Sequence, residues 1–229
     1  MNDVVLILFG YLYIVAVIIF SNRSEKLLGC SRETSRKLLH TLIGSLVFFV
    51  PLFDNWYSPV LVAAPFIPIT FLASPYSPLK LQFFDRIGLR GLSESGDWLG
   101  LVFYACAFTI LAGVFFNQPY VVAASIIPMT FGDGSAALVG RRFGSRMFRF
   151  MHGRTMEGSI GFFVFSFLGL AIYLGFLSLL QVHPINPWFV ICPVVAAVGA
   201  VVEALTPKGV DNLAVPLLCA MAMKILGEW

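Results

Sequence analysis

The chain has 229 residues, of which 59% are hydrophobic and 12% are charged, and its mean hydropathy is +0.88. A soluble domain carries about 25% charged residues, so this composition excludes a soluble globular protein. It indicates one integral membrane domain over residues 1–229, and the formal net charge of +3 is small. We expect the membrane as a partner and no nucleic acid, and the composition leaves homo-oligomerisation open.

Apolar segments long enough to cross a membrane follow one another along the chain. A spanning helix needs about 20 apolar residues, with a range of about 17–25. The predicted fold is therefore an all-α, polytopic transmembrane helical bundle with seven or eight spans, because the short final segment, which Pro216 interrupts, could be re-entrant or an eighth span. The predicted spans are residues 4–20, 36–53, 57–74, 97–116, 119–139, 158–180 and 187–205, and the short final segment is 212–226.

Basic residues are concentrated in alternate connections between these spans. The connections around Asp54, Asn117 and His183 contain no Lys or Arg, whereas the intervening ones hold nearly all of them. Lys and Arg accumulate in cytoplasmic connections. We therefore predict an uncleaved first span with its N-terminus outside, and cytoplasmic placement of the basic connections.

One polar stretch interrupts the apolar pattern between the fifth and sixth predicted spans. It covers residues 131–159, with the sequence FGDGSAALVGRRFGSRMFRFMHGRTMEGS. Carboxylates can hold a divalent metal, glycines let a backbone come close to a ligand, and arginines bind phosphate oxygens. The stretch thus favours phosphate chemistry, and from composition alone a solvated basic loop between two membrane helices explains it equally well.

Four carboxylates lie at or just inside the ends of apolar runs: Asp133, Glu157, Glu203 and Asp211. Burying an ionisable group there costs a few kcal/mol, so such a residue is a functional candidate. Helix capping is the alternative for Asp211 and Glu157. Four of them beside an arginine-rich loop favour a metal–nucleotide site.

A second polar cluster lies at the start of the second predicted span. His40 follows Arg36 and Lys37 by one helical turn, so the three side chains share a helix face. This face would bind phosphate and orient an alcohol. A basic helix end that reaches the interface beside a hydrogen-bonded histidine is an equal alternative.

Three motifs in this chain resemble those of the CTP-dependent lipid-alcohol kinases, the family of dolichol, phytol and farnesol kinases and the fungal CTP-dependent diacylglycerol kinase. The first is RKxxH at residues 36–40, and the second is FGDGSAA at 131–137 followed by TxEGS at 155–159. The third, VEALTPKGVDNLAVPL at 202–217, resembles the closing motif of the phytol-kinase branch. Arg154 stands where the family more often has lysine.

The resemblance implies transfer of the γ-phosphoryl group of CTP to an isoprenoid alcohol at the cytoplasmic face, with Mg²⁺ as cofactor. The alcohol would be a polyprenol or dolichol, phytol, farnesol or geranylgeraniol, and the products its monophosphate and CDP. The protein would lie in the plasma membrane of a prokaryote, or in the endoplasmic reticulum or plastid envelope of a eukaryote.

The resemblance also implies roles for individual residues. The catalytic residues would be Asp133, Glu157, His40 and Asp211, with His40 or a carboxylate as base. The metal ligands would be Asp133, Glu157 and Glu203, with Asp211 as a further candidate. The nucleotide would contact Arg36, Lys37, Gly132, Gly140, Arg141, Arg142, Gly144, Arg154, Thr155, Lys208 and Asn212.

Three alternatives remain at this stage. Phosphatidate cytidylyltransferases share the D-x-x-A…G…TxEG skeleton and use CTP, but they form a CDP-lipid, and their C-terminal run of lysine, aspartate, His-Gly-Gly and Asp-Arg is missing here. A CTP-dependent diacylglycerol kinase would share the motifs and differ in its acceptor. A non-enzymatic transporter would need polar residues at the membrane midplane, where the predicted spans carry almost no charge.

Overall fold

The computed structural model describes residues 2–87, 89, 99–147, 153–182 and 187–227. The regular elements of these residues are helices, apart from one isolated β-bridge between Met147 and Thr155, so the predicted all-α class is confirmed. The α-helices are α1 (Asp3–Leu28), α2 (Arg32–Gly44), α3 (Tyr57–Ala63), α4 (Phe66–Ala73), α5 (Gln82–Arg86), α7 (Gly100–Val114), α8 (Pro119–Ile127), α9 (Asp133–Phe143), α10 (Met156–Leu179), α11 (Trp188–Leu205) and α12 (Asp211–Leu226). A 3₁₀-helix, η1 (Ser45–Leu52), continues α2, and a π-helix, η2 (Pro128–Gly132), joins α8 to α9.

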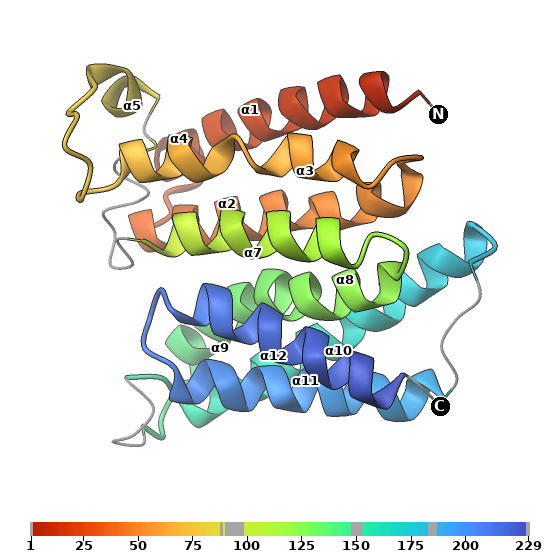
Figure 1. Ribbon diagram of the computed structural model, residues 1–229. Helices are drawn as coiled ribbons and strands as arrows, with labels where there is room; N and C mark the ends of the chain where they lie inside the picture. Colours follow the sequence, from red (N-terminus) through yellow and green to blue (C-terminus); the bar gives the residue numbers. More distant parts are fainter. Residues whose placement is uncertain (1, 88, 90–98, 148–152, 183–186, 228–229) are drawn as a thin grey trace.

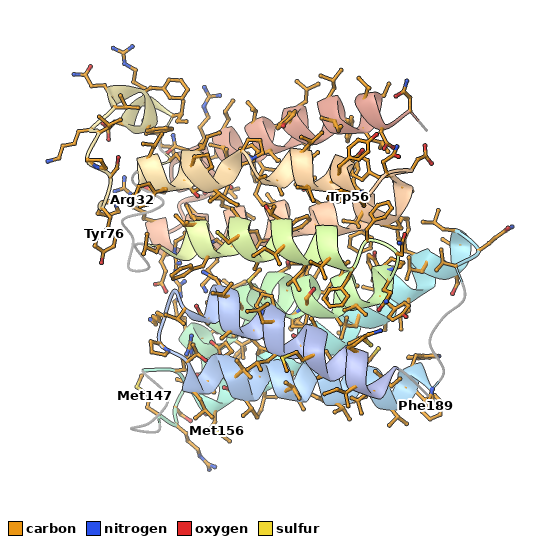
Figure 2. The ribbon with its side chains drawn as sticks, viewed as in Figure 1. Arg32, Trp56, Tyr76, Met147, Met156 and Phe189 are labelled. Atoms are coloured by element: carbon orange, nitrogen blue, oxygen red, sulfur yellow. The ribbon has the colours of Figure 1, made fainter. Side chains whose placement is uncertain are left out.

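The helices lie side by side with their axes roughly aligned (Figure 1). The first half of the chain, with α1, α3–α4, α2 and α7, forms one side of the bundle, and α8 to α12 form the other. Arg32 and Met147 mark one end of the bundle, and Trp56 and Phe189 mark the opposite end (Figure 2). The connections that carry the basic residues, as far as they are described, lie at the Arg32 end.

Among the described residues, five helical rods are long and apolar enough to cross a membrane: Asp3–Leu28, Arg32–Leu52, Pro119–Phe143, Met156–Leu179 and Trp188–Leu205. Tyr57–Ala73 and Gly100–Val114 are shorter apolar helices, and α12 has 16 residues. The chain is thus a membrane protein, whereas the predicted count of seven or eight spans and their orientation stay predictions.

Several helix ends differ from the predicted ranges for local reasons. α1 runs past residue 20 to Leu28, where Gly29 ends it with a left-handed φ of 65°. α2 begins at Arg32 because the Ser31 side chain accepts a hydrogen bond from the Thr34 backbone N–H. The range 57–74 is divided between α3 and α4 at Pro65, whose ring removes a backbone donor. The start of the range 97–116 lies outside the described residues, and α7 begins at Gly100.

The rod formed by α8, η2 and α9 is the most buried of the five and carries Asp133 into the bundle. The chain changes from α- to π-helix at Pro128, and the Asp133 backbone N–H donates to the Pro128 carbonyl. Such π turns occur mostly as single turns and often at functional sites.

Glycines allow this rod to pack closely against α10. A Cβ on Gly132 would collide with Ser166 and Phe162 of α10, and one on Gly140 would lie 2.9 Å from the Thr155 hydroxyl oxygen. Small residues let membrane helices approach at backbone distance. The contact fixes α9 relative to the start of α10, where the site lies.

Candidate active site

A polar cavity of about 380 Å³ lies at the Arg32 end of the bundle, where α2, α10 and α12 begin and α9 and α11 end. It brings together residues that are far apart in the sequence and come from all three motifs. The predicted site residues that line it are Arg36, Lys37, Asp133, Gly140, Arg141, Gly144, Arg154, Thr155, Glu203, Lys208 and Asp211.

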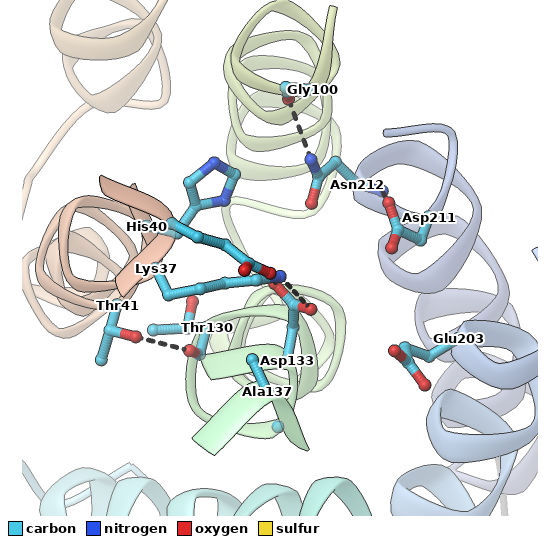
Figure 3. A network of polar contacts seen from close by, with 12 residues as sticks. Lys37, His40, Thr41, Gly100, Thr130, Asp133, Ala137, Glu203, Asp211 and Asn212 are labelled. Atoms are coloured by element: carbon cyan, nitrogen blue, oxygen red, sulfur yellow. Dashed lines mark hydrogen bonds and ion pairs between the residues drawn. The ribbon is translucent and has the colours of Figure 1, made fainter. Parts of the chain in front are cut away.

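Three carboxylates meet in this cavity: Asp133 at the start of α9, Glu203 near the end of α11 and Asp211 at the start of α12. Each contributes an oxygen atom that lies within 4.8 Å of the other two, and all three residues are buried. Figure 3 shows them directed toward a common space. Like charges this close repel one another, so the cluster requires cations.

Two partly buried cations pair with the three acids. The Lys37 ammonium donates to both Asp133 oxygens, with Nζ 2.5 Å from Oδ1. The Arg154 guanidinium bridges the other two acids, with Nε 2.5 Å from Glu203 Oε1 and Nη2 2.5 Å from Asp211 Oδ2. It also donates to the Thr206 carbonyl oxygen. Removing one partner of such a buried pair leaves an uncompensated charge, so these contacts are strongly interdependent.

The donor set fits Mg²⁺, a hard cation that takes oxygen ligands. Glu203 Oε2 is buried and has no hydrogen-bond partner among the described residues, although it lies within the acidic cluster. A buried carboxylate oxygen without a donor is costly, and a metal ion shared by Asp133, Glu203 and Asp211 would satisfy it.

Local structure orients Asp211 and Arg154 toward the cavity. Asp211 Oδ1 accepts hydrogen bonds from the backbone N–H of Gly209 at 2.8 Å and from that of Asn212 at 3.0 Å. These bonds fix the carboxylate at the start of α12. Gly209 has φ of 92°, a conformation that favours glycine. On the other side, Thr155 caps α10 by accepting the Gly158 N–H at 3.1 Å, directly after Arg154.

Further cations line the cavity. Arg36 is buried and Lys208 is exposed, and both line the cavity. Arg141 donates to the hydroxyls of Ser31 and Thr34 at 3.1 and 3.2 Å.

Glu33 is a lining residue that the sequence analysis did not assign to the site, and its carboxylate lies 3.6 Å from Arg141. Its position four residues before Lys37 places both on one helix face. That spacing could have identified it.

Five predicted site residues do not line the polar cavity: Glu157, Arg142, Asn212, Gly132 and His40. The Glu157 carboxylate turns away from the three acids and accepts the Ser145 hydroxyl at 2.6 Å and the Arg146 N–H at 3.4 Å. The structure therefore places Asp211, and not Glu157, beside Asp133 and Glu203.

Three of the others, Arg142, Asn212 and Gly132, have structural contacts of their own. Arg142 is exposed at the end of α9, with its guanidinium 6.0 Å from the centre of the Phe143 ring. Asn212 donates to the Gly100 carbonyl oxygen at 3.1 Å, so it ties α12 to α7. Gly132 serves the packing of η2 against α10.

His40, one turn after Lys37 on α2, does not line the polar cavity. It is 2% exposed and lines a separate apolar cavity, where its ring packs edge-on against Tyr104 with 4.9 Å between centroids. Lys37, one turn earlier, faces the polar cavity. The first motif thus contributes to two neighbouring cavities.

Known proteins with similar sequences are lipid kinases. The phytol kinase of Synechocystis sp. is 28% identical over 217 residues, which cover 91% of this chain and 86% of the relative. The probable chloroplastic phytol kinase of Triticum aestivum is 31% identical over 210 residues, which cover 85% of this chain and 68% of the relative. The chain belongs to the phytol kinase family.

A third relative shows the breadth of this family. CTP-dependent diacylglycerol kinase 1 of Schizosaccharomyces pombe is 27% identical to this lipid kinase over 210 residues, covering 85% of this chain and 93% of the relative. The family expected from the motifs is confirmed, and so is the enzyme class, a phosphotransferase with an alcohol group as acceptor. No family model and no solved structure matches the chain.

Proposed function

We propose that this lipid kinase transfers the γ-phosphoryl group of CTP to the hydroxyl of an isoprenoid alcohol. The observation that carries the proposal is the cluster of Asp133, Glu203 and Asp211 with two partly buried cations, in a polar cavity at one end of an apolar bundle. The relatives named phytol kinase support an isoprenoid acceptor, and the relative named CTP-dependent diacylglycerol kinase supports CTP as donor.

The three clustered carboxylates would hold Mg²⁺, which, when bound, neutralises charge on the phosphates of the donor. With Mg²⁺ bound, the carboxylates would depend less on Lys37 and Arg154 for charge compensation. Lys37 and Arg154 can each turn from a carboxylate to a phosphate oxygen within the same cavity, since both line it. Arginine suits this role because its planar fork can bind two oxygens at once.

The remaining lining residues would hold the rest of the triphosphate. Arg36, Arg141 and Lys208 add positive charge around the cavity, and phosphoryl transfer depends mainly on such positioning and charge neutralisation. Gly140 and Gly144 line the cavity where α9 packs against Thr155, and a Cβ at either position would collide with neighbouring atoms. The acceptor hydroxyl must also lose its proton, so a base must lie within hydrogen-bond reach.

The location of the cavity suits a lipid acceptor. It opens at the end of the bundle that carries the basic connections, which the positive-inside bias would place in the cytoplasm. CTP would approach from water, while the hydrocarbon part of the alcohol would stay among the helices. The plasma membrane, the endoplasmic reticulum and the plastid envelope all permit this arrangement.

Product analysis tests the proposal. The protein, purified in detergent, is incubated with Mg²⁺ and labelled CTP, separately with phytol, farnesol, geranylgeraniol, dolichol, diacylglycerol and phosphatidate. The proposal predicts CDP and a phosphorylated isoprenoid alcohol. Pyrophosphate with a CDP-lipid would instead show a cytidylyltransferase, and phosphorylation of diacylglycerol alone would overturn the isoprenoid assignment.

A further inference from the structure

The second cavity of the bundle is almost purely apolar. It measures about 70 Å³ and lies between α1, α2, α3–α4 and α7. Three polar side chains line it: His40, Thr70 and Tyr104. The other lining side chains are aliphatic or phenylalanine, so the cavity suits hydrocarbon and not a nucleotide.

His40 differs from the other two polar side chains in this wall. Thr70 donates to the Phe66 carbonyl oxygen at 2.6 Å, and Tyr104 donates to the His40 carbonyl oxygen at 3.2 Å. The imidazole nitrogens Nδ1 and Nε2 of His40 are both buried and have no hydrogen-bond partner among the described residues. Leaving buried polar atoms unpaired costs free energy, which indicates that a ligand supplies the partner.

His40 also connects this cavity with the phosphate site. It follows Lys37 by three residues on α2, and side chains at this spacing are neighbours, about 5–6 Å apart at Cβ. Lys37 in turn binds Asp133. Figure 3 shows the imidazole on the α7 side of α2, beside the Lys37–Asp133 pair. A hydroxyl held by His40 would thus lie at the boundary between apolar and polar cavities.

We propose that the apolar cavity holds the first carbons of the acceptor's hydrocarbon chain, and that His40 accepts the hydrogen bond of its hydroxyl. This rests on the proposed kinase function. In the transfer step, the alcohol oxygen forms a bond to the γ-phosphorus and the bond from that phosphorus to the CDP oxygen breaks. The hydroxyl proton passes to His40, and CDP leaves with the electron pair of the broken bond.

The small cavity selects the class of alcohol. It has room for one chain beside His40, and the chain would continue past Ile18 and Phe66, which line the cavity and are partly exposed. The two acyl chains of a diacylglycerol branch close to the hydroxyl and would have to enter together. We therefore expect a single-chain primary alcohol to be the preferred acceptor.

A cavity-filling variant tests this assignment. Ala105 is buried in α7 and lines the cavity, whereas the next residue, Cys106, is partly exposed and does not. Ala105→Leu should lower kcat/KM for geranylgeraniol roughly tenfold or more, mainly through KM, with the KM for CTP unchanged. Cys106→Leu, the matched control, should leave both constants near wild type.

The outcomes separate this inference from the proposed function. A wild-type protein that phosphorylates no alcohol contradicts the function itself. A wild-type kinase whose Ala105→Leu variant matches Cys106→Leu contradicts the cavity assignment alone.

A measurement without a variant covers the case in which Ala105→Leu does not fold. A photoreactive isoprenoid alcohol should label peptides that contain Ile43, Leu46 or Phe108 of the cavity wall, in competition with geranylgeraniol. Labelling confined to exposed lipid-facing residues such as Leu8 and Leu12 would overturn the assignment.

Discussion

The two ends of the bundle use carboxylates in opposite ways. At the Trp56 end, Asp3 accepts four hydrogen bonds, from the backbone N–H groups of Asp54 and Asn55, the Asn55 amide and the Ser58 hydroxyl, at 2.6 to 3.1 Å. All four donors are neutral, and they tie the start of α1 to the turn before α3. This carboxylate is fully used in holding two elements together.

At the Arg32 end, three buried carboxylates crowd together and depend on Lys37 and Arg154. One carboxylate oxygen, Glu203 Oε2, has no donor among the residues that the structure describes. A structural carboxylate is satisfied by neutral groups fixed in the fold. In the proposed site, the three carboxylates are paired with Lys37 and Arg154, and we propose that a metal ion would replace part of this pairing. The predictions below test this contrast between the two ends.

The largest effect should follow neutralisation of the cluster. Asp133→Asn and Asp211→Asn should each lower kcat/KM for CTP by about 1,000-fold, because each would remove a charged, proposed metal ligand from the transition state. The assay is formation of the lipid monophosphate, and Asp54→Asn at the opposite end is the matched control. An Asp211→Asn enzyme that kept more than about a tenth of wild-type activity would contradict the ligand assignment.

Metal binding should also appear as stability. Mg²⁺ together with CTP should stabilise the wild-type protein by about 2.7 kcal/mol when the free ligand is at about 100 Kd. The expected readout is an increase in Tm in detergent that EDTA reverses and that Glu203→Gln greatly reduces. An equal increase in wild type and variant would show that the metal binds elsewhere.

For activity, the positive charge of Arg154 should matter more than the planar geometry of its guanidinium group. Arg154→Gln leaves Glu203 and Asp211 without their shared cation, and kcat/KM should fall about 100-fold, largely through the KM for CTP. Arg154→Lys keeps the charge but loses the planar fork, and because the family more often has lysine here, it should stay within about tenfold of wild type. Equal losses in the two variants would show that the bridging geometry, and not the charge, is essential.

A change at the opposite end should affect stability alone. Asp3→Asn weakens the hydrogen bonds to residues 54–58 and should lower the free energy of unfolding by about 1–2 kcal/mol. Thermal unfolding measures this effect, and kcat/KM of the folded enzyme should be unchanged. Loss of activity without loss of Tm would mean that the two ends are coupled.

The fold was largely predictable because hydropathy and helix length constrain it strongly. Apolar runs located the helical rods, and Pro119–Phe143 extends the range 119–139 by only four residues. The π turn of η2 and the division at Pro65 were not predicted. Proline can either kink or end a helix, and tertiary packing decides which of the two occurs.

The sequence predicted which residue types form the site, but it did not predict which way each side chain points. The motifs identified Asp133, Glu203 and Asp211 as candidates, but they gave Glu157 equal standing. Whether Glu157 faces the cavity depends on the first turn of α10, where Ser145 binds its carboxylate across the preceding connection. The apolar cavity is built from several separate helices, so no local pattern could reveal it.

The most direct test compares Glu203→Gln with Glu157→Gln in one assay of phosphoryl transfer from CTP to geranylgeraniol. Both changes remove a carboxylate charge and keep the side-chain size, but only Glu203 belongs to the buried cluster. The structure predicts a loss of about 1,000-fold in kcat/KM for Glu203→Gln and less than about tenfold for Glu157→Gln. The reverse order would contradict the assignment of the metal site to Asp133, Glu203 and Asp211.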